Sequence, residues 1–285
     1  MNDLVRLSPF NGLPVTSDLA SADPFKIILA AMVALSYIMW VVAQTLIIWR
    51  GYKLKTFGMP ALGLISTVSL CFLTGFVGPW VAKDLFYSKE HWYLVWTWRL
   101  WWLQGVIIFV QFIRYGKYQL STALQPYFYM FVLVSVLVAG VTQWTFIIFF
   151  KDYYVNIACP LLCVLPMSFG YLMAPFTRSN LKGLSISAAW LLTIGTALLY
   201  LSVVLNDMSQ PYPGHQSTGY GFIYWIYGLT IFLYYVATVM LVHKTEALEA
   251  LPGVLPPGTR TLQLPGGATE LVVQNPLAKQ AAGEG

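Results

Sequence analysis

The chain has 285 residues, of which 58% are hydrophobic and only 9% are charged, and its mean hydropathy is +0.67. Soluble domains carry roughly 25% charged residues, so this composition excludes an ordinary soluble protein. The net charge of +5 does not indicate a nucleic-acid partner, because the basic residues lie mainly in short loops between apolar stretches.

Seven long apolar stretches follow one another along the chain. A membrane-spanning helix needs about 20 apolar residues. The stretches are continuously apolar, which favours helices, whereas the strands of a membrane barrel alternate between apolar and polar residues. The expected spans are residues 25–49, 59–82, 93–113, 127–150, 155–177, 186–206 and 222–243. We therefore expect an all-α integral membrane protein, a bundle of seven transmembrane helices.

Two terminal segments flank the expected membrane domain of residues 25–244. Residues 1–24 contain three aspartates and no apolar run, so we do not expect a cleaved signal peptide. Residues 245–285 are rich in Pro, Gly and Ala, which predicts a disordered tail. Lys and Arg favour the loops on the side of the C-terminus by eight to five. This bias predicts a multi-pass protein, expected in the endoplasmic reticulum, with a lumenal N-terminal segment and a cytosolic tail.

The third span carries Arg99 within a run of tryptophans that extends from Trp96 to Trp102. A charge inside the bilayer is costly and is a functional-site hypothesis by default. Indole rings also offer electron-rich faces to a cation. Three roles stay open for this arginine: it reaches the membrane surface, it pairs with an acidic residue, or it holds an anionic or oxygenated group of a ligand.

Thr97, Trp101, Gln104, Ile108 and Gln111 share one face of the third span, because they follow a four–three spacing. A face with two glutamines prefers the interior of the bundle to lipid. Its polar groups either hold helices together through hydrogen bonds or orient a substrate, and the sequence leaves both readings open.

Several aromatic residues also lie deep within the spans, among them Trp144, Tyr234 and Tyr235. Buried aromatic residues more often pack than act in catalysis, yet their number is compatible with stabilisation of a cation. We take the following residues as candidates for binding a substrate: Arg99, Trp101, Gln104, Trp144, Tyr234 and Tyr235.

Only four acidic residues, Asp84, Glu90, Asp152 and Asp207, lie between the first and last spans. All four are expected at loops or helix ends on the lumenal side. They are either solvated loop charges or a source of the general acid in a reaction. A carboxyl group shielded by aromatic rings has a raised pKa and keeps its proton near neutrality. These four residues are therefore the catalytic candidates.

Cys71, Cys159 and Cys163 all lie within expected spans, and an odd, buried set argues against a disulfide framework. Cys159 and Cys163 share a helix face, but no histidine lies near them in the sequence. We read them as small packing residues and expect no metal site and no cofactor.

Four short motifs follow one another from the second span onward: Gly58-Met59-Pro60, Trp98-Arg99-Leu100-Trp101-Trp102-Leu103, Arg114-Tyr115-Gly116 and Lys182-Gly183-Leu184-Ser185. In these motifs, and in their order over residues 50–240, the chain resembles the fungal membrane-bound terpene cyclases of meroterpenoid and indole-diterpene pathways. This resemblance implies a compact seven-helix enzyme that protonates an epoxide or alkene and then cyclises a prenyl chain.

The chain departs from the best-known branch of that family at three expected carboxylates. Cys71 and Gln104 stand at two of these positions, and the last span offers Tyr234, Tyr235 and Val236 near the third. The chain is similar instead to the divergent ascofuranone-type branch. The proton donor would then come from one of the four lumenal acids or from a tyrosine.

The resemblance implies an epoxidised prenyl or polyene substrate, contact with membrane lipid, and pathway partners such as a prenyltransferase and a flavin epoxidase. Water instead of an internal nucleophile would give epoxide hydrolysis. A non-catalytic small-solute transporter is the alternative from another class. A retinal protein is disfavoured, because residues 222–242 contain no lysine for a Schiff base.

Overall fold

The computed structural model describes residues 24–77, 92–119, 125–150, 159–177, 183–209, 218–249, 259–263 and 269–273. The chain divides into two units, Met1–Leu241 and Val242–Gly285. Three of the acids proposed from the sequence, Asp84, Glu90 and Asp152, lie outside the described residues.

The helices occur in the order and nearly at the positions that the apolar stretches predict. They are α1 (Pro24–Leu54), α2 (Ala61–Phe72) with the π-helical turn η2 (Leu73–Val77), α5 (Trp92–Tyr115), α6 (Phe128–Phe150), the π-helical turn η6 (Cys159–Val164) with α8 (Leu165–Thr177), α9 (Ile186–Ser209) and α10 (Thr218–Glu249). Short 3₁₀ turns, η3 (Gly116–Gln119) and η4 (Gln125–Tyr127), lie between α5 and α6. The helical class is therefore confirmed for the first unit.

Four helical segments of the described residues are long and apolar enough to cross a membrane: Pro24–Leu54, Gln125–Phe146, Ile186–Leu205 and Tyr224–Lys244. Shorter apolar segments cover Ala61–Val77 and Leu161–Ala174. Large apolar side chains on α6, such as Met130, Leu133 and Leu137, are exposed. These features indicate a protein embedded in a membrane.

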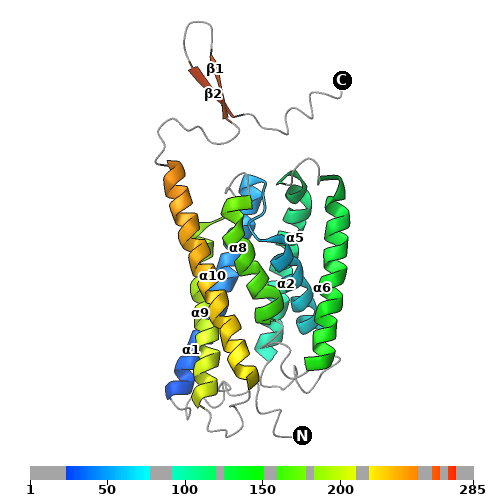
Figure 1. The fold of residues 1–285 in the computed structure, drawn as a ribbon, viewed down its shortest axis with the longest axis vertical. Coiled ribbons are helices and arrows are strands. Elements are labelled where there is room, and N and C mark those ends of the chain that lie inside the picture. Colours follow the sequence, from blue (N-terminus) through cyan, green and yellow to red (C-terminus); the bar gives the residue numbers. More distant parts are fainter. Residues whose placement is uncertain are drawn as a thin grey trace. The chain divides into compact units, whose positions relative to one another are not determined.

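Within the first unit, α1 packs along α9, while α2 contacts α5, α6 and α8 (Figure 1). Small residues allow the helices to approach closely. A Cβ on Gly195 of α9 would lie 2.9 Å from Cδ1 of Trp40. The backbone oxygen of Gly195 also accepts a hydrogen bond of 2.7 Å from Ser36 Oγ. Close approach through small residues and interhelical hydrogen bonds is the usual way helices associate in a membrane.

Two glutamines of α5 bind the backbone of α1 seven residues apart. Gln104 Nε2 donates to the carbonyl oxygen of Val41 at 3.1 Å, and Gln111 Nε2 donates to that of Ile48 at 2.8 Å. Both glutamines are buried. The face predicted to point into the bundle does so, and these two amides hold helices together.

The loops before α2 and before α9 are in contact, and both were noted for their resemblance to the cyclases. A Cβ on Gly183 would lie 3.1 Å from the carbonyl carbon of Phe57. A Cβ on Gly58 would in turn collide with the carbonyl oxygen of Gly183. Tyr171 of α8 donates a hydrogen bond of 2.8 Å to the Gly58 carbonyl oxygen. These motif residues therefore join three parts of the bundle.

Both of these loops also carry the signals that end and begin a helix. After α1, Lys55 has a φ of 49°, and Thr56 N–H donates to the Gly51 carbonyl oxygen at 3.0 Å. This is the hydrogen bond of a Schellman motif, which here forms without a glycine. Before α9, Ser185 Oγ accepts a hydrogen bond of 3.3 Å from Ala188 N–H, as an N-cap residue does.

Two π-helical turns interrupt the regular helices. In η2, the Thr74 hydroxyl donates to the Leu70 carbonyl oxygen at 2.8 Å and so binds a carbonyl of the preceding turn. Gly75 lies in the middle of η2, and Pro160, which lacks an N–H group, lies in η6. Such turns are often found at functional sites.

In the second unit, β1 (Thr259–Gln263) pairs antiparallel with β2 (Thr269–Val273), with Thr261 opposite Leu271. The expectation of disorder throughout residues 245–285 does not hold for this hairpin, nor for the end of α10. Both strands contain β-branched residues, and Pro265, Gly266 and Gly267 between them are turn formers. The average composition of the tail conceals this local pattern.

Candidate functional site

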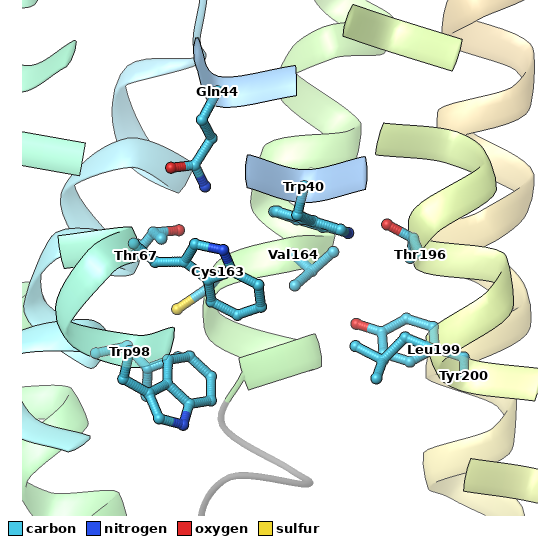
Figure 2. Close-up of a pocket in the computed structure, with 11 residues that line it drawn as sticks. Trp40, Gln44, Thr67, Trp98, Cys163, Val164, Thr196, Leu199 and Tyr200 are labelled. Atoms are coloured by element: carbon cyan, nitrogen blue, oxygen red, sulfur yellow. The ribbon is translucent and has the colours of Figure 1, made fainter. Parts of the chain in front are cut away.

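A cavity lies among α1, α2, α5, η6 and α9, inside the first unit. Figure 2 shows side chains from these elements converging on it. It is lined by Trp40, Gln44, Thr67, Leu70, Trp98, Trp101, Cys163, Val164, Thr196, Leu199 and Tyr200. None of these eleven side chains is charged.

The cavity is small, with a volume of about 30 Å³. A single water needs roughly 10–15 Å³. The cavity therefore admits about two waters or one small functional group, and the remainder of a larger ligand would have to lie outside it.

Aromatic rings form much of the wall. The rings of Trp98 and Trp101 meet edge to face at 5.2 Å, and the rings of Trp40 and Trp101 are 5.9 Å apart. Tyr200 is stacked on Tyr227 of α10, with a centroid distance of 4.1 Å. Each ring is thus held by a second ring, so the wall is fixed in place and presents π-systems that attract positive charge.

Five polar atoms of this wall are buried and have no hydrogen-bond partner within the described part of the chain. They are Trp40 Nε1, Gln44 Oε1, Thr67 Oγ1, Trp101 Nε1 and Thr196 Oγ1. Each side chain is more than nine-tenths buried. A buried polar group that forms no hydrogen bond costs about 1–3 kcal/mol. Five such groups around one cavity give it a built-in capacity to bind polar atoms.

Arg99 does not line this cavity. Its Nε donates a hydrogen bond of 3.0 Å to the carbonyl oxygen of Gly75 in η2. The guanidinium also lies over the rings of Phe76 and Trp96, at 5.3 Å and 4.9 Å from their centroids. Arg99 is partly buried. Among the described residues, Arg99 therefore contacts a backbone oxygen and two aromatic rings. The tryptophans beside it in the sequence had suggested such contacts with rings.

The other residues proposed to bind substrate are dispersed. Of the six, Trp101 alone lines this cavity. Gln104 faces α1, where its Nε2 also donates to Thr45 Oγ1 at 3.0 Å. Trp144 and Tyr235 are exposed, by 40% and 52%, while Tyr234 is buried with its ring 6.0 Å from that of Tyr171. The structure does not bring these six side chains together.

Of the four acidic candidates, Asp207 of α9 lies within the described residues. Its backbone is described, but its side chain is not. It follows Tyr200 of the cavity wall by seven residues, or about two turns and 10 Å along the helix axis. Asp84, Glu90 and Asp152 were proposed with it and lie outside the described residues.

The cysteines of the described helices are buried thiols. Cys71 and Cys163 are in no disulfide among the described residues, and Gln143 Nε2 donates to Cys163 Sγ at 3.3 Å. Within the described part of the chain, no group of three or more His, Cys, Asp or Glu side chains is placed to hold a metal ion. The side chain of Cys159 lies outside that part.

Of the eleven residues of the cavity wall, sequence reasoning named only Trp101 as a site residue. Four of those it missed carry a buried polar atom without a partner among the described residues: Trp40, Gln44, Thr67 and Thr196. The signal that was available is a polar or indole side chain within an otherwise apolar span. Trp40 and Gln44 are four residues apart on α1, so they share a face. Their convergence with α2 and α9 depends on helix packing, which the spacing within one helix does not reveal.

Comparisons of the chain with protein-family models, with curated proteins and with solved structures return no match. The chemistry of the cavity and the resemblance of the short motifs are the grounds for a proposal of function.

Proposed function

We propose that this protein is a membrane-bound terpene cyclase that opens an epoxide on a prenylated or polyene intermediate by general-acid protonation and closes a ring. The observation that carries the proposal is the uncharged cavity within the helices, walled by Trp40, Trp98, Trp101 and Tyr200. An epoxide that is protonated develops positive charge on carbon, and the wall must stabilise this charge without reacting with it.

Indole rings suit this task. A cation over an indole face gains about 0.5–2 kcal/mol, more when water is excluded. Trp98 and Trp101 are both buried, so their faces are shielded from solvent. The rings are also poor nucleophiles compared with carboxylates and thiolates. The cation would therefore persist until an alkene or hydroxyl of the same substrate captures it.

The proton would come from a carboxyl group near the lumenal end of the bundle. Asp207 is the candidate whose helix also supplies a wall of the cavity, through Thr196, Leu199 and Tyr200. Asp84, Glu90 and Asp152 complete the set of candidates. A positioned general acid of this kind contributes typically about 10²–10⁴-fold to the rate.

In the proposed topology the chain crosses the membrane seven times. The four long apolar segments would be joined as spans by α2 with η2, by α5, and by η6 with α8. The Lys and Arg bias supports a cytosolic C-terminus, and the endoplasmic reticulum is the proposed membrane.

Epoxide hydrolysis is the second candidate, because the cavity has room for about two waters. A water bound near the cation would capture it in place of the internal nucleophile. Such a product is heavier than the substrate by one water, whereas a cyclised product is an isomer of the substrate.

The deciding experiment is expression of the full chain with candidate epoxidised prenyl compounds, followed by mass analysis of the products. Trp101→Leu should abolish the product, while Trp225→Leu should not, because Trp225 is 79% exposed on α10. An isomeric product supports the cyclase and a hydrated product supports the hydrolase. Accumulation of unchanged compound across the membrane, with no product from any candidate, would favour a small-solute transporter.

A further inference from the structure

The threonines in the wall of the cavity differ from those elsewhere in the helices. A helical threonine commonly donates its hydroxyl to the carbonyl oxygen four residues earlier. Six threonines of the described helices do so: Thr45, Thr74, Thr145, Thr193, Thr230 and Thr238. Thr67 and Thr196 do not, although both are buried. Their hydroxyl groups therefore remain available to a ligand.

The other unpartnered polar atoms of the wall are either hydrogen-bond donors or acceptors. The indole N–H groups of Trp40 and Trp101 only donate hydrogen bonds, whereas Gln44 Oε1 only accepts them. Elsewhere in the bundle, Gln104 and Gln111 each use the amide nitrogen in a bond to α1. The oxygens Gln104 Oε1 and Gln111 Oε1 are also buried without a partner in the described part of the chain, so an unpartnered amide oxygen is not special to the cavity. The two buried indole N–H groups without a partner among the described residues, by contrast, both belong to this wall.

We propose that the cavity binds the hydroxyl group of a neutral, largely apolar ligand. A hydroxyl group has one donor and two acceptor lone pairs. One hydroxyl group can therefore bind the Gln44 acceptor and two of the indole or threonine donors of the wall. An epoxide or ether oxygen can use the donors alone and leaves Gln44 Oε1 without a partner.

Charged head groups do not fit this wall. None of the eleven lining side chains carries a charge, and an ion buried without a counter-ion is strongly disfavoured. The cavity volume of about 30 Å³ suits a group of the size of a hydroxyl, and the apolar body of the ligand would extend beyond the cavity. A role of this site in catalysis rests on the proposed function, and the substrate would then carry a hydroxyl group besides its epoxide. The binding of a hydroxyl group does not depend on that function.

The probes for the test are geraniol, geranyl methyl ether and geranyl diphosphate, which differ only in the head group. Thermal unfolding of the full-length protein is measured in one detergent at increasing probe concentration. We expect geraniol to raise the unfolding temperature. We expect the same rise in unfolding temperature to require an about tenfold higher concentration of the ether, because one buried acceptor stays without a partner. The diphosphate should not change the unfolding temperature.

Two variants remove a cavity hydroxyl while keeping the shape of the side chain: Thr196→Val and Thr67→Val. We expect each to be at least as stable as the parent without probe, because an unfulfilled polar group is lost, and to bind geraniol about tenfold more weakly. The control is Thr193→Val on the same helix. The Thr193 hydroxyl binds Ala189 and lies 3.0 Å from that of Thr238, so this variant should lose stability but keep its affinity for geraniol.

Equal shifts with geraniol and its ether would overturn the recognition of a hydroxyl group. If geraniol does not raise the unfolding temperature and Thr196→Val lowers it, the cavity holds only water. That outcome also overturns the inference. If Thr196→Val does not fold, Thr67→Val decides. Geraniol binding without product from any epoxide would refute the proposed reaction and leave this site intact. Turnover that is unaffected by either valine variant would refute the site alone.

Discussion

The side chain of Arg99 binds the backbone of Gly75: its Nε donates a hydrogen bond of 3.0 Å to the glycine's carbonyl oxygen. Gly75 has no side chain, and a Cβ there would lie 3.3 Å from Cγ of Arg99. The π-helical turn η2 thus presents a backbone oxygen at close range to the arginine. This contact, together with the Phe76 and Trp96 rings, stabilises a charge within α5.

Replacing Arg99 by methionine should lower the free energy of unfolding by about 1–3 kcal/mol, because the Gly75 carbonyl oxygen loses its charged donor. Unfolding in one detergent measures the effect. Lys53→Met is the control, since Lys53 is exposed and lies over the Trp49 ring at 5.0 Å, and we expect a change of at most about 1 kcal/mol there. An Arg99→Met variant with parental stability would show that the contact contributes nothing.

Gln111→Leu should destabilise the bundle by about 0.5–1.5 kcal/mol, because the hydrogen bond between α5 and the Ile48 carbonyl is lost. Leu103→Ala on the same helix is the control, since Leu103 is 52% exposed and its removal should matter little. Equal effects of the two substitutions would contradict a role for Gln111 in joining the helices.

Gly183→Ala should destabilise the protein by about 1–3 kcal/mol, because the added methyl group meets the Phe57 backbone. Gly140→Ala should have the opposite sign, a gain of about 0.5–1 kcal/mol, because Gly140 lies inside α6 with open space around it. The paired unfolding measurements test whether the two loops are in contact, and a neutral Gly183→Ala would show that they are not.

Single amide substitutions test the proton donor: Asp84→Asn, Glu90→Gln, Asp152→Asn and Asp207→Asn. At least one should lower product formation by about 10²–10⁴-fold with normal folding, because an amide keeps the size of the side chain but cannot supply the acidic proton. If all four variants turn over substrate at the parental rate, a carboxyl donor from this set is refuted. Tyr234, which is buried on α10, is then the next group to substitute.

A glycosylation reporter fused after Gly285 tests the orientation. The Lys and Arg bias predicts that the reporter stays unmodified, because the tail is cytosolic, whereas a reporter before residue 24 becomes glycosylated. Modification of the C-terminal reporter would reverse the proposed topology. Modification at both ends would indicate an even number of spans.

The positions of the helices follow from hydropathy, but their lengths do not. The first span was expected to end at residue 49, whereas α1 continues to Leu54. The last was expected to end at residue 243, and α10 continues to Glu249. An apolar run measures the part of a helix that lies in hydrocarbon. Polar residues such as Arg50 and Lys244 extend the hydrogen-bonded backbone beyond it at little cost.

The interior face of α5 was predictable, and the cavity was not. Gln104 and Gln111 recur at seven residues on one helix, so a single sequence segment reveals their shared face. Thr67 and Thr196 are isolated hydroxyl groups on α2 and α9, separated by more than a hundred residues. Their meeting depends on which helices pack together. The distance along the chain carries no information on that choice.

The π-helical turn η2 should allow the second span to tolerate the deletion of one residue. A π turn holds about one residue more than an α turn, so deletion of one residue within Leu73–Val77 leaves a regular helix as an allowed outcome. The segments on the two sides of the deletion would then keep about the same facing, because the extra residue is accommodated within the π turn itself. We expect chains related to this one to differ by single-residue gaps at this turn, and a gap at Gly75 to remove the carbonyl that now faces Arg99.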